Sequence, residues 1–183
     1  EKLVTLTGGQ KYVVDAAEFV VFCADLHRHV EIIPHAKTGF VEHLLIATAD
    51  AGLMAQNALL AAQSLGMGGV FIGGIRNNPL DVCELLNLPK HVFPLFGLCL
   101  GYPDQDPDVK PRLPLSIVVH ENEYQPLNKT TLTGYDQTVK AYYEERTGGK
   151  VSTSWSDTIE TKLTREARPL MKDALAKQGF GVK

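Results

Sequence analysis

The sequence contains few cysteines and no secretion signal. Its three cysteines, Cys23, Cys83 and Cys99, lie far apart in apolar stretches, where a reduced cysteine behaves as a small hydrophobic side chain. No charged and then apolar signal peptide opens the chain. A disulfide framework is therefore not expected, and we predict a cytoplasmic protein in which the sequon Asn128-Lys129-Thr130 carries no glycan.

The sequence also has a small net charge and lacks long apolar runs. The chain has 18 Lys and Arg residues against 21 Asp and Glu, a formal net charge of −3, so no global basic field would recruit nucleic acid or an anionic membrane. No run approaches the roughly 18 apolar residues that a transmembrane helix needs. We therefore expect any anionic ligand to be bound by local groups.

The remaining composition is that of a folded protein. Hydrophobic residues make up 44% of the 183 residues, which fits one domain over residues 1–183. Helical and strand-like segments follow one another without regular alternation, so the fold class is expected to be α+β. The chain has no initiating methionine, which suggests that this single domain is incomplete at its N-terminus.

Hydrophobic periodicity predicts the individual elements. Residues 40–64 form the clearest helix, rich in Ala, Leu and Met, and its many alanines suggest close neighbours, as at a dimer seam. A box of Ser154 and Asp157 is expected to cap a helix. Residues 103–114, which we call the strap, contain four prolines in twelve residues and should be extended and exposed. The other expected elements are buried strands at 17–24, 70–72 and 94–102, and helices at 79–86, 132–146, 156–164 and 169–178.

A glycine cluster is the most informative local feature. Phe71-Ile72-Gly73-Gly74 could pass its backbone against a flat ring or a phosphate, because glycine carries no Cβ. It could equally mark a bend at the end of a buried strand. The spacing does not match the dinucleotide-binding fingerprint. Arg76, just beyond, could reach a phosphate or simply be solvated.

Basic residues provide two further candidate sites. In Lys110-Pro111-Arg112 the proline favours an extended backbone, which would project both basic side chains to one side, where they could clamp one anion. The alternative is a solvated basic pair. Four more basic residues lie around the loop of residues 147–154 and the helix that follows it: Arg146, Lys150, Arg165 and Arg168. They form either a solvated basic face or a site that attracts an anion.

A metal-dependent hydrolase is a weaker alternative. His-x-His can share a metal ion in an extended segment, but the usual cysteine or carboxylate partners have no matching spacing. A Cys–His nucleophile pair is weaker still, because apolar surroundings raise a thiol pKa. The residues that invite the metal hypothesis are Asp25, His27, His29, His35 and His43.

Several segments together resemble the NfsA-like branch of the nitroreductase family, the oxygen-insensitive NADPH nitroreductases. The resemblance is collinear over essentially the whole chain. It is carried by LVTLTGGQK, AEFVVFCAD, MAQNALLAAQSLGMGGVFIGGIRNN, LPKHVFPLFGLCLGYP, KPRLPLSIVVHENEYQPL, the YDQ and YYEERT region, WSDTIE and EARPLMKDALAKQGF.

The resemblance implies a nitroreductase-like mixed sheet flanked by helices and an intertwined homodimer with one FMN in each of two interface sites. It implies a ping-pong oxidoreductase in which NADPH passes hydride to flavin N5 and a nitroaromatic or quinone then takes it. The flavin carries the hydride, so no side chain is assigned as catalytic.

The resemblance also assigns residues. Gln10 corresponds to an amide side chain that contacts the flavin. The backbone along the flavin ring corresponds to Phe71, Ile72, Gly73 and Gly74. Two cations beside FMN correspond to Lys110 and Arg112. Arg146 corresponds to a residue for the NADPH 2′-phosphate, for which a guanidinium is suited. Arg168 corresponds to an arginine near the substrate and nucleotide mouth.

Two departures from the family pattern matter. The family's opening segment, with a His-Arg-Ser-x-x-Arg type motif for the FMN phosphate, has no counterpart in the sequence. The loop of residues 147–154 also aligns poorly, and Lys150 could replace a second basic residue there. An alternative to the enzyme is therefore an inactive dimerising fragment of the same fold, with weak or absent FMN binding.

Overall fold

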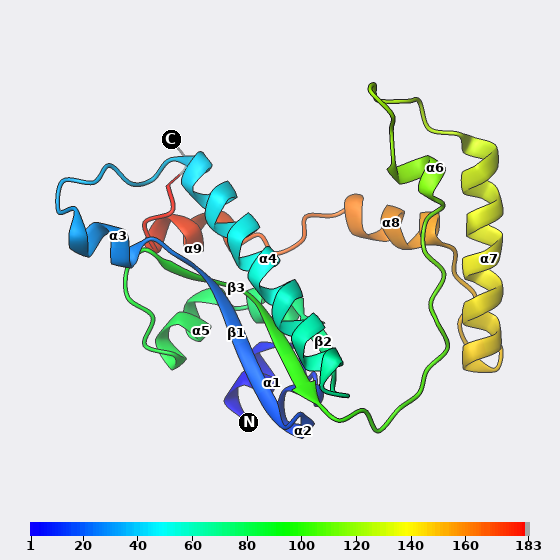
Figure 1. Ribbon diagram of the computed structural model, residues 1–183, viewed down its shortest axis with the longest axis horizontal. Helices are drawn as coiled ribbons and strands as arrows, with labels where there is room; N and C mark the ends of the chain where they lie inside the picture. The colour runs from blue at the N-terminus through cyan, green and yellow to red at the C-terminus, as the bar shows by residue number, and fades with distance from the viewer. Residues whose placement is uncertain (182–183) are drawn as a thin grey trace. The chain divides into compact units, whose positions relative to one another are not determined.

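The computed structural model describes residues 1–181. The chain forms two compact units, which are described separately: Glu1–Asp104 with Arg168–Lys183, and Gln105–Ala167 (Figure 1). The first unit contains a sheet with helices, and the second contains helices joined by extended chain. The single-domain organisation stays a prediction.

The first unit is built on a three-stranded antiparallel sheet. Its strands are β1 (Glu18–Asp25), β2 (Gly68–Ile72) and β3 (Val92–Gly101), in the order β1-β3-β2. β3 is the central strand and is buried over most of its length, because both of its edges are paired and helices pack against it. The three predicted strands are present, with shifts of one or two residues at their ends, but the predicted burial is confirmed only for β3, because β1 is partly exposed and most of β2 is exposed.

Gly97, in the middle of β3, makes room for an aromatic ring from β1. A Cβ built on Gly97 would lie 2.2 Å from Cζ of Phe19. Gly97 pairs with Val21, so Phe19 is its diagonal neighbour, within reach of a long side chain. The ring therefore occupies the space that a side chain at Gly97 would need.

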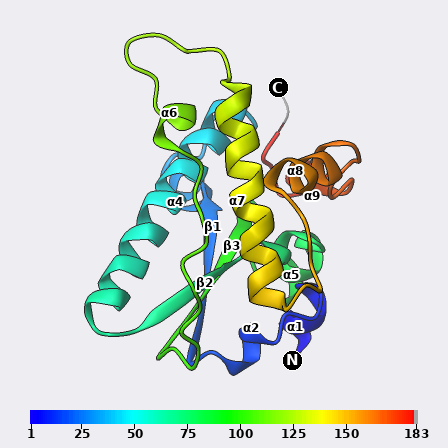
Figure 2. The same ribbon diagram turned by 90° about the vertical axis from the view of Figure 1, so that its right-hand side faces the viewer.

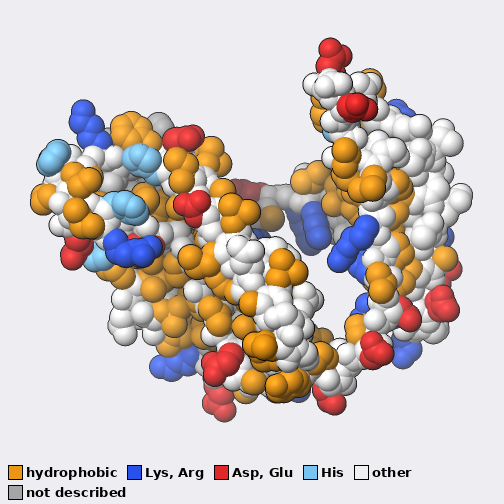
Figure 3. Space-filling view, in the orientation of Figure 1, with side chains coloured by type: hydrophobic (Ala, Val, Ile, Leu, Met, Phe, Trp, Pro, Cys, Tyr) orange, Lys and Arg blue, Asp and Glu red, His pale blue; other side chains and the backbone are white. Residues whose placement is uncertain are grey.

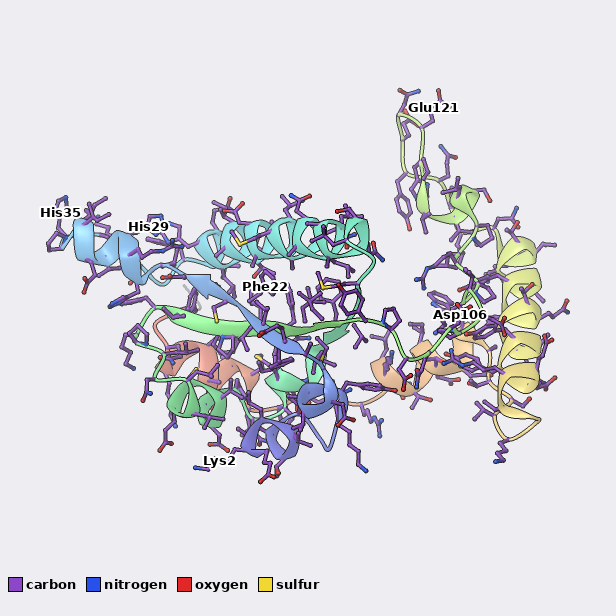
Figure 4. The ribbon with its side chains drawn as sticks, turned by 60° about the horizontal axis from the view of Figure 1, so that its bottom comes forward. Lys2, Phe22, His29, His35, Asp106 and Glu121 are labelled. Carbon is purple, nitrogen blue, oxygen red and sulfur yellow. The ribbon has the colours of Figure 1, made fainter. Side chains whose placement is uncertain are left out.

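The long helix α4 (Val41–Ser64) packs against all three strands, on the face of the sheet opposite α1, α5 and α9 (Figure 4). Ala51 and Ala55 are buried against the core, whereas Leu53 and Met54 are 67% and 66% exposed. The expectation that no segment suits a membrane was wrong, because α4 is long and apolar enough to span one by length and composition. Only 11% of its most apolar stretch is buried.

Shorter helices complete the first unit. Pro79 stands at the start of α5, as predicted, and α9 supplies the buried Ala174. The three helices before α4 were not predicted, since four to six residues give no helical period. The bounds are α1 (Lys2–Leu6), α2 (Tyr12–Asp15), α3 (His27–Ile32), the 3₁₀ turn η1 (Gly73–Arg76), α5 (Pro79–Leu85) and α9 (Met171–Lys177).

The second unit contains residues 105–114 of the strap and three helices, α6 (Leu115–Val118), α7 (Lys129–Thr147) and α8 (Trp155–Leu163). Ser154 and Asp157 form the predicted capping box at α8, and Gly148 ends α7 with φ of 59°. The strap lies beside α7 (Figure 2), where the Tyr135 hydroxyl donates to the Pro111 carbonyl oxygen at 3.1 Å. The predicted exposure of the strap is confirmed for residues 103–110.

Candidate functional site

The glycine turn that follows β2 has no space for side chains at its second residue. A Cβ on Gly74 would lie 2.3 Å from the carbonyl oxygen of Thr7 and 2.9 Å from Oε1 of Gln10. Gln10 Oε1 is buried and has no hydrogen-bond donor among residues 1–181. A buried amide oxygen without a donor is costly in a folded protein, so it marks a position that a ligand N–H could satisfy.

Arg168 closes the same turn from the far end of the chain. Its guanidinium donates from NH2 to the Gly73 carbonyl oxygen at 3.1 Å and from Nε to Oδ1 of Asn77 at 3.1 Å. The backbone of Arg168 has φ of 60°, which is unusual for a residue with a side chain. Arg168, predicted to lie near the substrate and nucleotide mouth, is thus in contact with Gly73, which was predicted to lie along the flavin ring.

Arg76 is held by the sheet instead of being solvated. Its NH1 donates to the Leu95 carbonyl oxygen on β3. Burial, together with the neighbouring charge of Arg168, lowers the pKa of the Arg76 guanidinium from its ordinary value. Two cations therefore lie close to each other at the glycine turn.

The two residues before the glycines differ in exposure. Ile72 is 1% exposed and belongs to the core, whereas Phe71 is 41% exposed. The Phe71 ring meets Phe96 edge to face, with centroids 5.6 Å apart. At Ile72 only the backbone can therefore serve a ligand, whereas Phe71 also presents part of its ring.

In the second unit, Lys110 is held by a tyrosine of α7. Its Nζ donates to the Tyr143 hydroxyl at 2.7 Å and lies 5.1 Å from the ring centroid. The ammonium has three donors, so two remain for a ligand. Arg112 is exposed.

Arg146, in the last turn of α7, is held in the same way. Its NH1 donates to the Tyr142 hydroxyl at 2.6 Å, and Cζ lies 5.8 Å from the ring centroid. The two residues are four positions apart on one helix, the spacing that brings side chains together. Neither Tyr142 nor Tyr143 was assigned a role from the sequence, although the four-residue spacing to Arg146 was a usable signal.

The structure thus gathers the predicted residues in two places. Gln10, Gly73, Gly74 and Arg168 meet at the glycine turn of the first unit. Lys110 and Arg146 lie on two adjacent tyrosines of the second unit. Thr7 and Asn77, which contact the glycine turn, were missed because small polar residues carry little signal by themselves.

The histidine segment does not have the form of a metal site. His27 and His29 lie on helix α3, where residues two apart face different directions. Asp25 pairs instead with Arg28 at 3.0 Å and accepts from the His27 backbone N–H. Among residues 1–181, no three His, Cys, Asp or Glu side chains form a group able to hold a metal ion. His35 lies at the outer end of this region (Figure 4).

The cysteines are unsuited to nucleophilic chemistry, as predicted. Burial raises the pKa of the Cys23 thiol to about 11, with smaller contributions from Cys83 and Asp25. Burial also raises the pKa values of Cys83 and Cys99. At neutral pH these groups are therefore thiols, not thiolates.

A groove of about 890 Å³ lies between β1, α3 and α4. Its walls are mainly apolar, and Arg28, Lys37, His29 and His43 lie at the α3 end, where Figure 3 shows basic and histidine side chains beside the apolar ones. None of the residues assigned to the flavin lines this groove.

Comparison with known proteins gives a consistent result. Residues 5–102 match the Nitroreductase family and residues 110–183 match its C-terminal domain. The chain is 55% identical over 183 residues to the oxygen-insensitive NADPH nitroreductase of Salmonella typhimurium, covering all of this chain and 76% of that protein.

Two solved structures are similar throughout. Nitroreductase A from Vibrio parahaemolyticus has a TM-score of 0.92 and 49% identity, over 100% of this chain and 75% of that one. The NADPH:FMN oxidoreductase from Vibrio harveyi, solved in complex with NAD⁺, has a TM-score of 0.90 and 49% identity, over 97% and 74%.

Proposed function

This chain belongs to the nitroreductase family, and on that basis we propose that it is an FMN-dependent oxidoreductase that transfers hydride from NADPH to nitroaromatic compounds and quinones by a ping-pong mechanism. The observation that carries the proposal is that Gln10 Oε1, buried beside the Gly74 backbone, has no hydrogen-bond donor among residues 1–181. Similar proteins are named as an NADPH nitroreductase and an NADPH:FMN oxidoreductase.

The residues at the glycine turn fit a flavin. An amide oxygen without a donor suits a ring N–H, and a backbone without Cβ atoms suits the close approach of a flat ring. When bound, FMN supplies the ring that accepts and then gives up a hydride. Gln10 and the backbone of residues 71–74 would orient that ring.

The cations would serve the charged parts of the cofactors. We assign Lys110 and Arg112 to FMN and Arg146 to the NADPH 2′-phosphate, since guanidinium groups suit phosphate and Lys110 keeps two donors after binding Tyr143. Arg168 would act at the nucleotide and substrate mouth. These assignments rest on the family resemblance and on the chemistry of each side chain.

We further propose that the partner of α4 is a second copy of this chain, giving a homodimer, and that the protein acts in the cytoplasm on small molecules. Leu53, Met54 and Leu60 are more than half exposed on a 24-residue helix, and exposed apolar side chains gathered on one helix are typical of a protein–protein interface. The absence of a global basic charge argues against nucleic acid as a partner.

A second candidate function is a dimerising fragment that binds no flavin, favoured by the same exposed face of α4. The visible absorption spectrum of the purified chain, after incubation with excess FMN and desalting, separates the two. A retained flavin band supports the enzyme. The affinity for FMN should then fall about tenfold in Gln10→Leu and stay unchanged in the exposed control Gln137→Leu. A colourless protein would contradict it.

A further inference from the structure

Two adjacent tyrosines on α7 each hold one of the cations assigned above. Tyr142 binds Arg146 and Tyr143 binds Lys110. The two rings also meet each other edge to face, with centroids 5.4 Å apart. All four residues belong to the second unit, so the arrangement is contained within one compact body.

The hydrogen bonds of Tyr142 have a consistent direction. Its hydroxyl accepts from Arg146 NH1 at 2.6 Å and lies 3.5 Å from the Asp108 carbonyl oxygen, to which it donates. The hydroxyl proton and one of the two lone pairs of the oxygen are therefore used. Tyr142 joins the end of α7 to the strap and fixes one nitrogen of Arg146.

Tyr143 has a different pattern. Its hydroxyl accepts from Lys110 Nζ, and its backbone carbonyl accepts from the Thr147 hydroxyl at 2.7 Å. The Thr147 hydroxyl in turn accepts from the Val151 backbone N–H at 2.9 Å. The backbone of Tyr143 is thus held in the final turn of α7, and its hydroxyl accepts from the strap lysine.

The charges of both cations remain available for an anion. Among residues 1–181, the salt bridges are His27–Glu31 and Arg28–Asp25, so neither Lys110 nor Arg146 has a carboxylate partner. A phenol hydroxyl orients a cation without neutralising it, whereas a carboxylate would do both. Both tyrosines are half-buried and both cations are exposed. The tyrosine rings can therefore hold the cations in place while the ammonium and guanidinium groups stay accessible to a ligand.

We propose that Tyr142 and Tyr143 are positioning residues, which hold Arg146 for the 2′-phosphate of NADPH and Lys110 for FMN, respectively. The inference rests on the proposed function. Holding a long side chain in one rotamer before binding removes part of the entropy cost of binding. Tyr142 therefore contributes to the choice of NADPH over NADH without contacting the nucleotide.

The experiment compares Tyr142→Phe, Tyr143→Phe, Arg146→Ala and the double variant Tyr142→Phe/Arg146→Ala in the FMN-loaded protein. Phenylalanine keeps the ring and its cation–π contact, so the variants remove only the hydroxyl. The readouts are KM and kcat for NADPH and for NADH, and the Kd of 2′,5′-ADP by calorimetry. Titration of apoprotein with FMN, followed by flavin fluorescence, gives the Kd of the cofactor.

Tyr142→Phe is expected to raise KM for NADPH and the Kd of 2′,5′-ADP about three- to tenfold, with kcat and the KM for NADH unchanged. It should have no further effect when Arg146 is already alanine. Tyr143→Phe should weaken FMN binding by a similar factor and leave the ratio of the two KM values unchanged. Each tyrosine variant is thus the control for the other.

Four outcomes would overturn the inference. If Arg146→Ala leaves the Kd of 2′,5′-ADP unchanged, the assignment of Arg146 to NADPH is wrong and the role of Tyr142 is lost with it. If Arg146→Ala weakens binding but Tyr142→Phe does not, or the two effects add fully, only the positioning role is wrong. Equal effects of both tyrosine variants on FMN and on nucleotide would indicate a structural role alone.

Discussion

The guanidinium of Arg168 donates to the carbonyl oxygen of Gly73 at 3.1 Å, although 95 positions separate them in the chain. Arg168 is also the residue at which the chain re-enters the first unit. Its second contact, to Asn77, lies just beyond the same turn. The end of the chain therefore fixes a turn that was formed near its middle.

The backbone of Arg168 can be tested separately from its side chain. Arg168→Ala and Arg168→Gly both lose the hydrogen bonds to Gly73 and Asn77, but only glycine adopts φ of 60° without steric cost. We expect the glycine variant to have a higher free energy of unfolding than the alanine variant by about 1 kcal/mol. Urea denaturation measures the difference, and equal values would show that this φ carries no strain.

The adjacent glycines Gly73 and Gly74 offer a matched pair of substitutions. Gly74→Ala would place Cβ 2.3 Å from the Thr7 carbonyl oxygen, whereas at Gly73 the nearest atom is Arg76 NH2 at 3.7 Å, an ordinary contact. We expect Gly74→Ala to destabilise the fold by about 1–3 kcal/mol and Gly73→Ala to have less than half that effect. Thermal denaturation of both variants checks this, and similar losses would refute the tight packing at Gly74.

The exposed face of α4 predicts the oligomeric state. Leu53→Glu should convert the dimer into a monomer, because a carboxylate cannot be buried at an apolar interface without a partner. Analytical ultracentrifugation measures the change. Leu163 is 80% exposed on α8, so Leu163→Glu is the control and should remain dimeric. Wild-type protein that floats with lipid vesicles would instead indicate a membrane as the partner of α4.

The raised pKa of Cys23 predicts a change of stability at alkaline pH. The folded protein binds the thiol proton more tightly than the unfolded chain, so the stabilisation is complete below the unfolded pKa near 9 and is lost as pH rises through the folded pKa of about 11. The free energy of unfolding should therefore fall between pH 9 and 11, and less steeply in Cys23→Ala. An identical slope in both proteins would contradict the raised pKa.

The elements with strong sequence patterns were those that could be predicted. Helix α4 and strands β1 and β3 have long apolar patterns, and α8 has a complete capping box. The short helices α1, α2 and α3 could not be predicted, since four to six residues give no helical period. For α3, the alternative of an extended His-x-His segment was wrong for this reason.

The candidate site was predictable as residue types but not as contacts. The glycines at residues 73 and 74 and the cations of the strap could be selected because their chemistry is specific. That Arg168 would reach Gly73, or that Tyr143 would hold Lys110, depends on how distant segments meet. Such contacts leave no periodic signal in one sequence.

The ring of Phe19 over Gly97 links two positions that lie on different strands. Any larger residue at position 97 requires a smaller one at position 19, and neither change alone keeps the sheet packed. The two positions should therefore vary together among related proteins, and a designer who wishes to stiffen β3 by replacing Gly97 must redesign β1 in the same step.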